Sequence, residues 1–220
     1  MKNSMFLALL CIGLLSARAQ KVIEKHISFS PKNFVSMNFQ ISDSIRIITW
    51  KKDEVYIHSS IDVNDNQDND DYKMVFDETG STINVSAHLE TDNSRRSKKR
   101  DSCDCCCNYR TKIFHEVYIP ENADFSVETI NGNIIINGNT AEIRAKSISG
   151  FIDLAIAPGR KADLKMHTIT CTMYSNIDLP TSRHIKQVGG GSITAELNGG
   201  GGKPIDLETI SGNIFFRKEG

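Results

Sequence analysis

The sequence predicts an all-β fold, arranged as a β-solenoid or β-helix-like stack of two-strand coils of about 20 residues each. Three observations support this fold class. Apolar and polar residues alternate along much of the chain, a short motif returns at a nearly constant interval, and no stretch after residue 19 keeps helical apolar spacing over three turns. The alternative is a β-sandwich of ordinary hairpins, because regularly spaced short strands also occur in sandwiches.

The first 19 residues predict a signal peptide. Lys2 gives a positive start, an apolar run extends from Met5 to Leu15, and Ala17-Arg18-Ala19 provides a small-x-small cleavage site. The exported chain is therefore expected to begin at Gln20. This apolar run is too short to cross a bilayer, which takes about 20 residues, and no later run is longer, so no transmembrane segment is expected.

Residues 20–122 are expected to form an N-terminal β region. Apolar alternation predicts strands around Ile41, Val55 and Ile113, and Asp77-Glu78-Thr79-Gly80 predicts a hairpin turn. Two segments interrupt the alternation: residues 62–71 are crowded with Asp and Asn, and residues 90–112 hold a basic run and a cysteine cluster. Both segments are predicted to be solvated loops.

Residues 123–220 carry the repeat. Five segments align, and they begin at Val127, Ala145, Met166, Ile185 and Leu207. Three residues further along, each segment has a β-branched apolar residue: Ile130, Ile148, Ile169, Val188 and Ile210. Two residues after that, four segments have glycine (Gly132, Gly150, Gly190 and Gly212) and one has Cys171.

This pattern describes a strand, a sharp corner and a second strand. Gly132, Gly150, Gly190 and Gly212 are the expected structural corner residues, because glycine accepts a positive φ and leaves room for a second backbone. We expect a positive φ at Gly150 and Gly212. One unit cannot bury its own apolar face, so successive coils are expected to stack, with Thr, Ser, Asn and Lys facing outward.

The segments VETINGNIIING, AKSISGFIDL and LETISGNIFF, preceded by HEVYIPENADFSVET, resemble the bacterial putative-adhesin family. That family is a domain-of-unknown-function group with T-x-S-G-x-I strand repeats, and the resemblance covers roughly residues 39–218. It implies a β-solenoid or β-helix-like fold, envelope association or export, and an adhesin-like role. It supplies no catalytic motif. The sequence departs from the family pattern at Cys171, at the extra glycine in Gly189–Gly191, and at the cysteine cluster.

Four cysteines lie within five residues: Cys103, Cys105, Cys106 and Cys107. Together with Cys171 they leave an odd number after the signal peptide is removed. In an oxidising compartment they are expected to form disulfides within a chain or between chains. Disulfides between chains would give a disulfide-linked oligomer. A zinc or soft-metal site and thiols without a role are the other two interpretations, although neighbouring residues of an extended run point in alternating directions.

Other candidate motifs are weak. Asp62, Asn64, Asn66 and Asp68 alternate oxygen ligands as a calcium loop does, but Gln67 and Lys73 replace the expected Gly and Glu, so a solvated acidic loop is favoured. The six histidines are scattered, and neither an HExxH motif nor a Gly-x-Ser-x-Gly turn occurs. We therefore predict no catalytic residue, no cofactor and no enzyme.

The charge balance bears on the partner. The chain has 26 basic and 27 acidic residues, a net charge of −1, which lacks the basic excess of nucleic-acid-binding proteins. We expect a non-enzymatic protein of the periplasm, the cell surface or the secreted fraction that binds an envelope protein, a host-surface protein or a glycan. The alternative is a structural or envelope-stress component that interacts with other envelope proteins.

Overall fold

A computed structural model describes residues 20–90, 110–138, 141–180 and 187–219. The all-β prediction is confirmed, because these residues form fourteen strands and one short 3-10 turn, Asn69–Asp71. No helix among them is long and apolar enough to span a membrane. The strands are β1 (Lys21–Ser28), β2 (Phe34–Phe39), β3 (Ile41–Trp50), β4 (Glu54–Val63), β5 (Tyr72–Thr79), β6 (Thr82–Leu89), β7 (Thr111–Pro120), β8 (Asp124–Asn137), β9 (Ile143–Ser149), β10 (Ile152–Ile156), β11 (Ala162–Ser175), β12 (Gln187–Leu197), β13 (Ile205–Ser211) and β14 (Ile214–Lys218).

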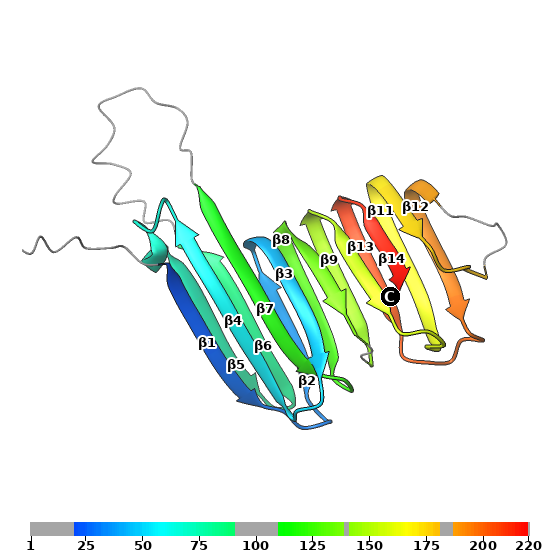
Figure 1. The fold of residues 1–220 in the computed structure, drawn as a ribbon, viewed down its shortest axis with the longest axis horizontal. Helices are drawn as coiled ribbons and strands as arrows, with labels where there is room; N and C mark the ends of the chain where they lie inside the picture. Colours follow the sequence, from blue (N-terminus) through cyan, green and yellow to red (C-terminus); the bar gives the residue numbers. More distant parts are fainter. Residues whose placement is uncertain (1–19, 91–109, 139–140, 181–186, 220) are drawn as a thin grey trace, which may run out of the picture.

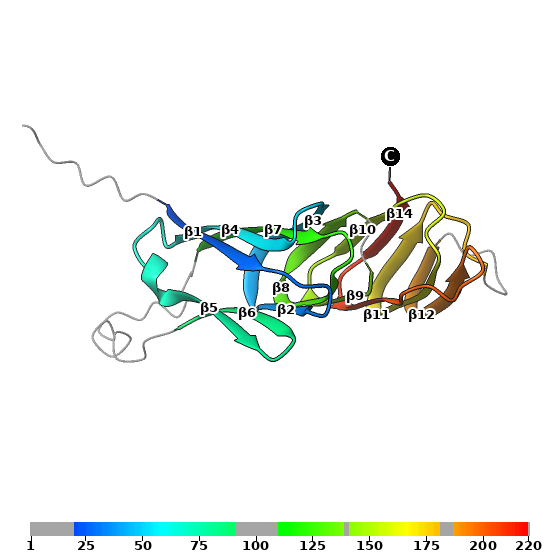
Figure 2. The same cartoon turned by 90° about the horizontal axis from the view of Figure 1, so that it is seen from below.

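The strands form two layers that run along the long axis of the molecule, from β1 at one end to β12 at the other (Figure 1). Layer one contains β1, β4, β7, β3, the second half of β8, β10, β14 and the second half of β11. Layer two contains β5, β6, β2, the first half of β8, β9, β13, the first half of β11 and most of β12. The view from below shows the two layers as separate rows (Figure 2).

The long strands β8 and β11 each pass from layer two into layer one. As a result, the pairings β8-β10-β14-β11-β13-β9-β8 close a ring of six parallel strands, and the other strands extend it on both sides. Antiparallel pairing occurs only toward the two ends of the described sheet, among β1, β4 and β7, between β5 and β6, and between β11 and β12. The hairpins of an ordinary sandwich therefore do not connect the repeats inside the ring.

The order of the repeat units differs from the sequential stack that the sequence predicts. The fifth unit, β13 and β14, lies between the second unit, β9 and β10, and the third unit, β11. The fourth unit, β12, runs antiparallel to β11. The physical reason is that the repeat specifies how each unit turns its corner but not which unit lies beside it. Several units have similar corners, so more than one neighbour is possible.

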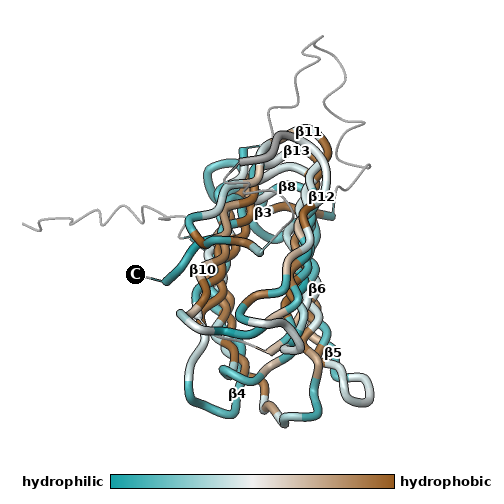
Figure 3. The backbone as a smooth tube through the Cα atoms, turned by 90° about the vertical axis from the view of Figure 1, so that its right-hand side faces the viewer, coloured by the Kyte–Doolittle hydropathy of each residue, from teal (hydrophilic) through white to brown (hydrophobic). Residues whose placement is uncertain are grey.

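The core lies between the two layers, where the end-on view shows hydrophobic positions facing one another (Figure 3). Strand alternation points every second residue inward. From layer two, Val127, Ala145, Leu207 and Met166 are buried, and from layer one the residues Ile134, Ile152, Ile214 and Met173 are buried. The same cluster continues into residues 20–122, so the N-terminal β region and residues 123–220 share one hydrophobic core.

Three of the four corner glycines form a column at the point where the units change layers. A Cβ added to Gly150 would overlap the carbonyl oxygen of Gly132, and a Cβ added to Gly212 would overlap that of Gly150. The expected positive φ is found at Gly150, at 146°, but the prediction is wrong for Gly212, which is not among the residues with positive φ. Close approach of the backbones is therefore what requires glycine at Gly212.

Candidate binding surface

The outer face of layer two carries three regular rows of side chains across β8, β9, β13 and β11. Strand register sets the residues of the first two rows side by side, and the isoleucine row follows two residues further along each strand. The first row is Ser126, Arg144, Asp206 and Lys165; the second row is Glu128, Lys146, Glu208 and His167; the isoleucine row is Ile130, Ile148, Ile210 and Ile169. We call the three rows together the ladder face.

Ion pairs connect neighbouring strands on the ladder face. Lys146 Nζ lies 3.2 Å from Glu208 Oε1, and Lys165 Nζ lies 3.5 Å from Asp206 Oδ2. The ring of His167 contributes a polar contact, with Nδ1 2.7 Å from Ser192 Oγ on β12. The charged side chains of these ion pairs are all at least 39% exposed, so each pair contributes at most about 1 kcal/mol to folding. Stability alone does not explain the regularity of the rows.

The isoleucine row is exposed. Ile130, Ile148 and Ile169 are 49%, 39% and 57% accessible, and Ile210 is half-buried. The expectation that outward positions are Thr, Ser, Asn and Lys is therefore wrong for this row. Alternation from Val127, which points inward, places Ile130 outward because it lies three residues further along. The odd spacing between Val127 and Ile130 is therefore the sequence signal that the isoleucine side chain points outward.

The hydroxyl residue that precedes each isoleucine points inward instead. Thr129, Ser147, Thr209 and Thr168 are all buried. Ser147 Oγ donates to the carbonyl of Gly132 at 3.1 Å, and Thr209 Oγ1 donates to the carbonyl of Gly212 at 2.6 Å. The hydroxyls of Ser147, Thr168 and Thr209 thus bind corner carbonyls, which must find hydrogen-bond donors when they are buried. The first residue of the T-x-S-G motif is thus structural.

Shallow hollows mark the ladder face. One, of about 110 Å³, is lined by Gln40, Glu128, Ile130, Lys146 and Ile148, among others. A second, of about 280 Å³, includes Arg144 and Asp206. A third hollow, of about 960 Å³, lies beside Asp163, Glu196 and Pro180. Among the described residues, no group of three or more His, Cys, Asp or Glu side chains could hold a metal ion.

A buried polar chain crosses between the layers. It could not be predicted from the sequence, because its members are far apart along the chain. His115 on β7 has Nδ1 2.8 Å from Ser59 Oγ and Nε2 3.0 Å from the Tyr72 hydroxyl, which donates to the Ile41 carbonyl at 3.3 Å. Burial lowers the pKa of His115 to about 3, so its ring is neutral. Ser59 and His115 are 0% and 1% accessible, which keeps any substrate away from the hydroxyl.

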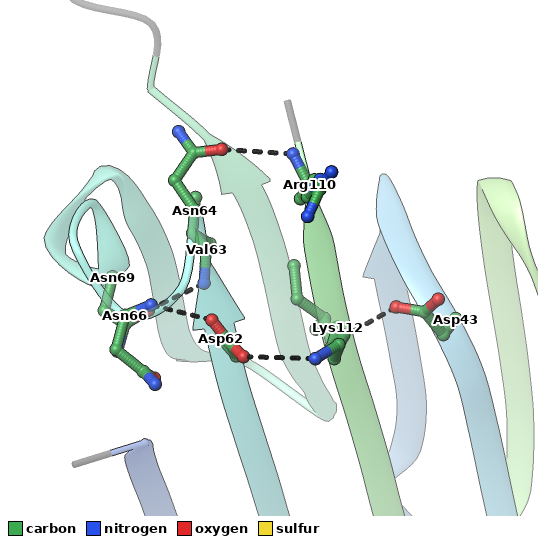
Figure 4. Close-up of polar contacts among 9 residues, drawn as sticks. Asp43, Asp62, Val63, Asn64, Asn66, Asn69, Arg110 and Lys112 are labelled. Carbon is green, nitrogen blue, oxygen red and sulfur yellow. Dashed lines mark hydrogen bonds and ion pairs between the residues drawn. The ribbon is translucent and has the colours of Figure 1, made fainter. Parts of the chain in front are cut away.

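In the acidic loop, residues 62–71, side-chain oxygens accept hydrogen bonds from backbone amides (Figure 4). Asp62 Oδ1 accepts from the Asn66 amide at 2.8 Å, and Asn69 Oδ1 accepts from the Val63 amide at 2.7 Å. Asn64 Oδ1 accepts from the Arg110 amide at 3.1 Å, which ties the loop to the start of β7. Asn64 and Asn66 have positive φ values of 51° and 62°. These oxygens satisfy backbone donors of the loop and of the start of β7.

Of the five cysteines after residue 19, Cys171 lies in the described part of the chain. Cys103, Cys105, Cys106 and Cys107 lie outside the described residues. Cys171 takes the corner position of β11 and is a free, half-exposed thiol. Gly190 lies in β12 with a φ of 59° and packs against the carbonyl of Ile169.

Comparisons with known proteins concern the fold. No family model and no curated protein matches the sequence. Among solved structures, the chain is similar to a putative cell adhesion protein from Clostridium sporogenes, with 9% identity, a TM-score of 0.55, and coverage of 91% of this chain and 100% of that one. A putative adhesin from Bacteroides fragilis is also similar, with 9% identity, a TM-score of 0.32, and coverage of 92% and 99%. The first of these shows that the chain shares its fold with a solved protein.

Proposed function

We propose that this chain is an exported, non-enzymatic protein with an adhesin-like binding surface, and that this surface is the ladder face. The observation that carries the proposal is the isoleucine row, which repeats an apolar side chain on the outer face of four adjacent strands, exposed on three of them and half-buried at Ile210. Contiguous exposed apolar residues bordered by polar ones are typical of interaction sites. A Thr at these positions would also have suited the strand.

The remaining polar features support binding over catalysis. The Ser59-His115-Tyr72 chain is sealed in the core, and the oxygens of the acidic loop bind backbone amides. The fold shared with the putative cell adhesion protein of Clostridium sporogenes is consistent with an adhesin-like role. The partner we propose is an envelope protein, a host-surface protein or a glycan.

Export is the second part of the proposal, and it rests on the sequence of residues 1–19, which lie outside the described residues. Fractionation of producing cells, combined with proteolysis of intact cells, tests it. An outward binding protein is degraded by added protease, whereas a periplasmic structural or envelope-stress component is protected until the envelope is opened. Recovery in the cytosolic fraction would contradict both roles.

Binding itself is tested with labelled residues 20–220 applied to intact producing cells. Changing Ile130, Ile148 and Ile169 together to Asn should reduce binding by at least about 10-fold, since a few residues carry most of the binding energy of an interface. The matched control changes Val22 and Phe114 to Asn, because these are 52% and 46% exposed but lie on layer one. Equal binding by the two variants, or no binding by the unaltered chain, would overturn the assignment of the surface.

A further inference from the structure

The charges of the ladder face alternate in sign across the strands. In the order β8, β9, β13, β11, the first row is neutral, positive, negative, positive, and the second row is negative, positive, negative, with His167 last. This alternation exists because the fifth unit is inserted out of chain order. In chain order Arg144 would lie beside Lys165, and Asp206 would lie beyond both.

If the strand order is reversed, the charges of the first row become complementary to those of the unreversed first row, and the same holds for the second row. Reversal sets Arg144 opposite Asp206 and Ser126 opposite Lys165 in the first row. In the second row it sets Lys146 opposite Glu208, and Glu128 opposite His167. In the isoleucine row, reversal sets isoleucine opposite isoleucine: Ile148 opposite Ile210, and Ile130 opposite Ile169.

We propose that the ladder face docks onto the ladder face of a second copy of this chain, about a two-fold axis that runs parallel to the strands between β9 and β13. The inference rests on the proposed function, in which this face is a binding surface, and it names the partner. Such an axis reverses the strand order of one copy relative to the other. Every charge in the two rows is then opposite an opposite charge or a polar group, which is how complementary interfaces select their partners.

The competing face-to-face arrangement is unfavourable. An axis across the strands would set each strand against its own equivalent, with Lys146 opposite Lys146 when the second rows meet. Like charges brought together at an interface oppose association. The charge order therefore selects the arrangement with reversed strands.

The margins of the ladder face are compatible with this arrangement. The flanking strands β2 and β12 would meet through Ser36 and Asn38 on one copy and Thr194 and Ser192 on the other, all polar. The charge complementarity ends at the start of the strands, because there Asp124 would lie opposite Asp163, which has the same charge. Asp124 already pairs with Lys203 in its own chain at 3.0 Å, so this row forms the rim.

The size of the patch predicts a reversible dimer. Six strands about 4.8 Å apart and three rows about 6.8 Å apart give roughly 600 Å² on each copy. The total of roughly 1,200 Å² is at the lower limit of specific interfaces. We therefore expect dissociation in the micromolar range, and weaker association at high salt because the charges are exposed.

Sedimentation of residues 20–220 over a range of concentrations, with a reductant present to remove disulfide links, tests the inference. The unaltered chain should shift from monomer to dimer. Lys146→Glu and Glu208→Lys should each raise the dissociation constant by at least about 10-fold, because each places like charges opposite one another twice. The double variant exchanges both signs, restores the opposite charges within and between chains, and should dimerise again.

Arg46→Glu is the matched control, since it breaks a comparable ion pair, Arg46 with Glu116, on the outer face of layer one. It should dimerise as the unaltered chain does, and circular dichroism should show that all variants are folded. A monomer at every concentration, or a double variant that stays monomeric, would overturn the inference. Neither result would affect the proposed function, which depends on the cell-binding experiment with the isoleucine variants.

Discussion

At the scale of single residues, the repeat motif reverses the usual positions of polar and apolar side chains. Thr129 is buried and Ile130 is 49% exposed. Hydroxyls point inward because corner carbonyls need donors, and Ser147 and Thr209 satisfy this need. In the first full repeat, however, Thr129 Oγ1 is buried and has no hydrogen-bond partner among the described residues. An unmatched buried hydroxyl of this kind costs about 1–3 kcal/mol.

This difference gives a prediction about two threonines at equivalent positions. Thr129→Val should leave the free energy of unfolding unchanged or raise it by about 1 kcal/mol, because it removes an unmatched hydroxyl. Thr209→Val should lower it by about 0.5–1.5 kcal/mol, the net value of one hydrogen bond, because the Gly212 carbonyl keeps the Thr168 hydroxyl as a donor at 3.2 Å. Denaturant titration of both variants measures the two values. Equal losses would contradict the structural role assigned to the inward hydroxyls.

A second prediction concerns His115, whose pKa burial lowers to about 3. As pH falls below about 6.5, the unfolded chain takes up a proton at this residue and the folded chain does not. The stability that the neutral ring provides is therefore present above pH 6.5 and is lost as pH falls toward 3. Between pH 7 and pH 5 the loss from this residue should be about 2 kcal/mol.

Denaturant titration at the two pH values checks this prediction, with His115→Gln as the comparison. The variant is expected to be less stable at pH 7, because the hydrogen bonds to Ser59 and Tyr72 change. Its loss of stability between pH 7 and pH 5 should nevertheless be smaller than that of the unaltered chain by about 2 kcal/mol. An equal loss in both chains would assign the pH dependence to other groups.

At the scale of elements, the glycine column leads to a third prediction. Gly212→Ala should lower the free energy of unfolding by more than about 3 kcal/mol, since the added Cβ would overlap the Gly150 carbonyl and backbone cannot easily move aside. Gly80→Ala is the control, because Gly80 has a φ of 63° but no atom within 4 Å of an added Cβ. The control should lose only about 1–2 kcal/mol, the cost of a left-handed non-glycine residue.

Thermal unfolding of the two variants, followed by circular dichroism, distinguishes the two causes. A larger loss in Gly80→Ala would mean that backbone conformation, and not close approach, explains glycine at the corners.

The sequence predicted the elements better than their arrangement. Alternation and corner glycines located the strands of residues 123–220, because both signals are local. The pairing of β14 with β10 and β11 joins segments far apart in the chain, and nothing local distinguishes it from a sequential stack. The isoleucine row could have been found from its odd spacing to Val127. The burial of His115 could not, because Ser59 and Tyr72 come from other strands.

At the scale of the whole molecule, the predicted signal peptide leads to a prediction about the N-terminus of the exported form that we propose. The motif Ala17-Arg18-Ala19 places cleavage before Gln20. Mass analysis of the protein recovered from producing cells should give a chain that starts at Gln20. Recovery of a chain that retains residues 1–19 would contradict export by this route.

The inserted position of β13 and β14 also bears on when the protein can fold. During synthesis β10 and β11 emerge well before residues 205–218, yet the ring gives them a common neighbour, β14, that has not yet been made. A nascent chain that ends before Ile205 therefore has β9, β10 and β11 with apolar faces and no complete sheet to bury them. Closure of the ring must wait for the last unit, and non-local pairing of this kind is slow. We therefore expect the ring of six strands to stay open until β14 has been made, a state that is compatible with the export that we propose.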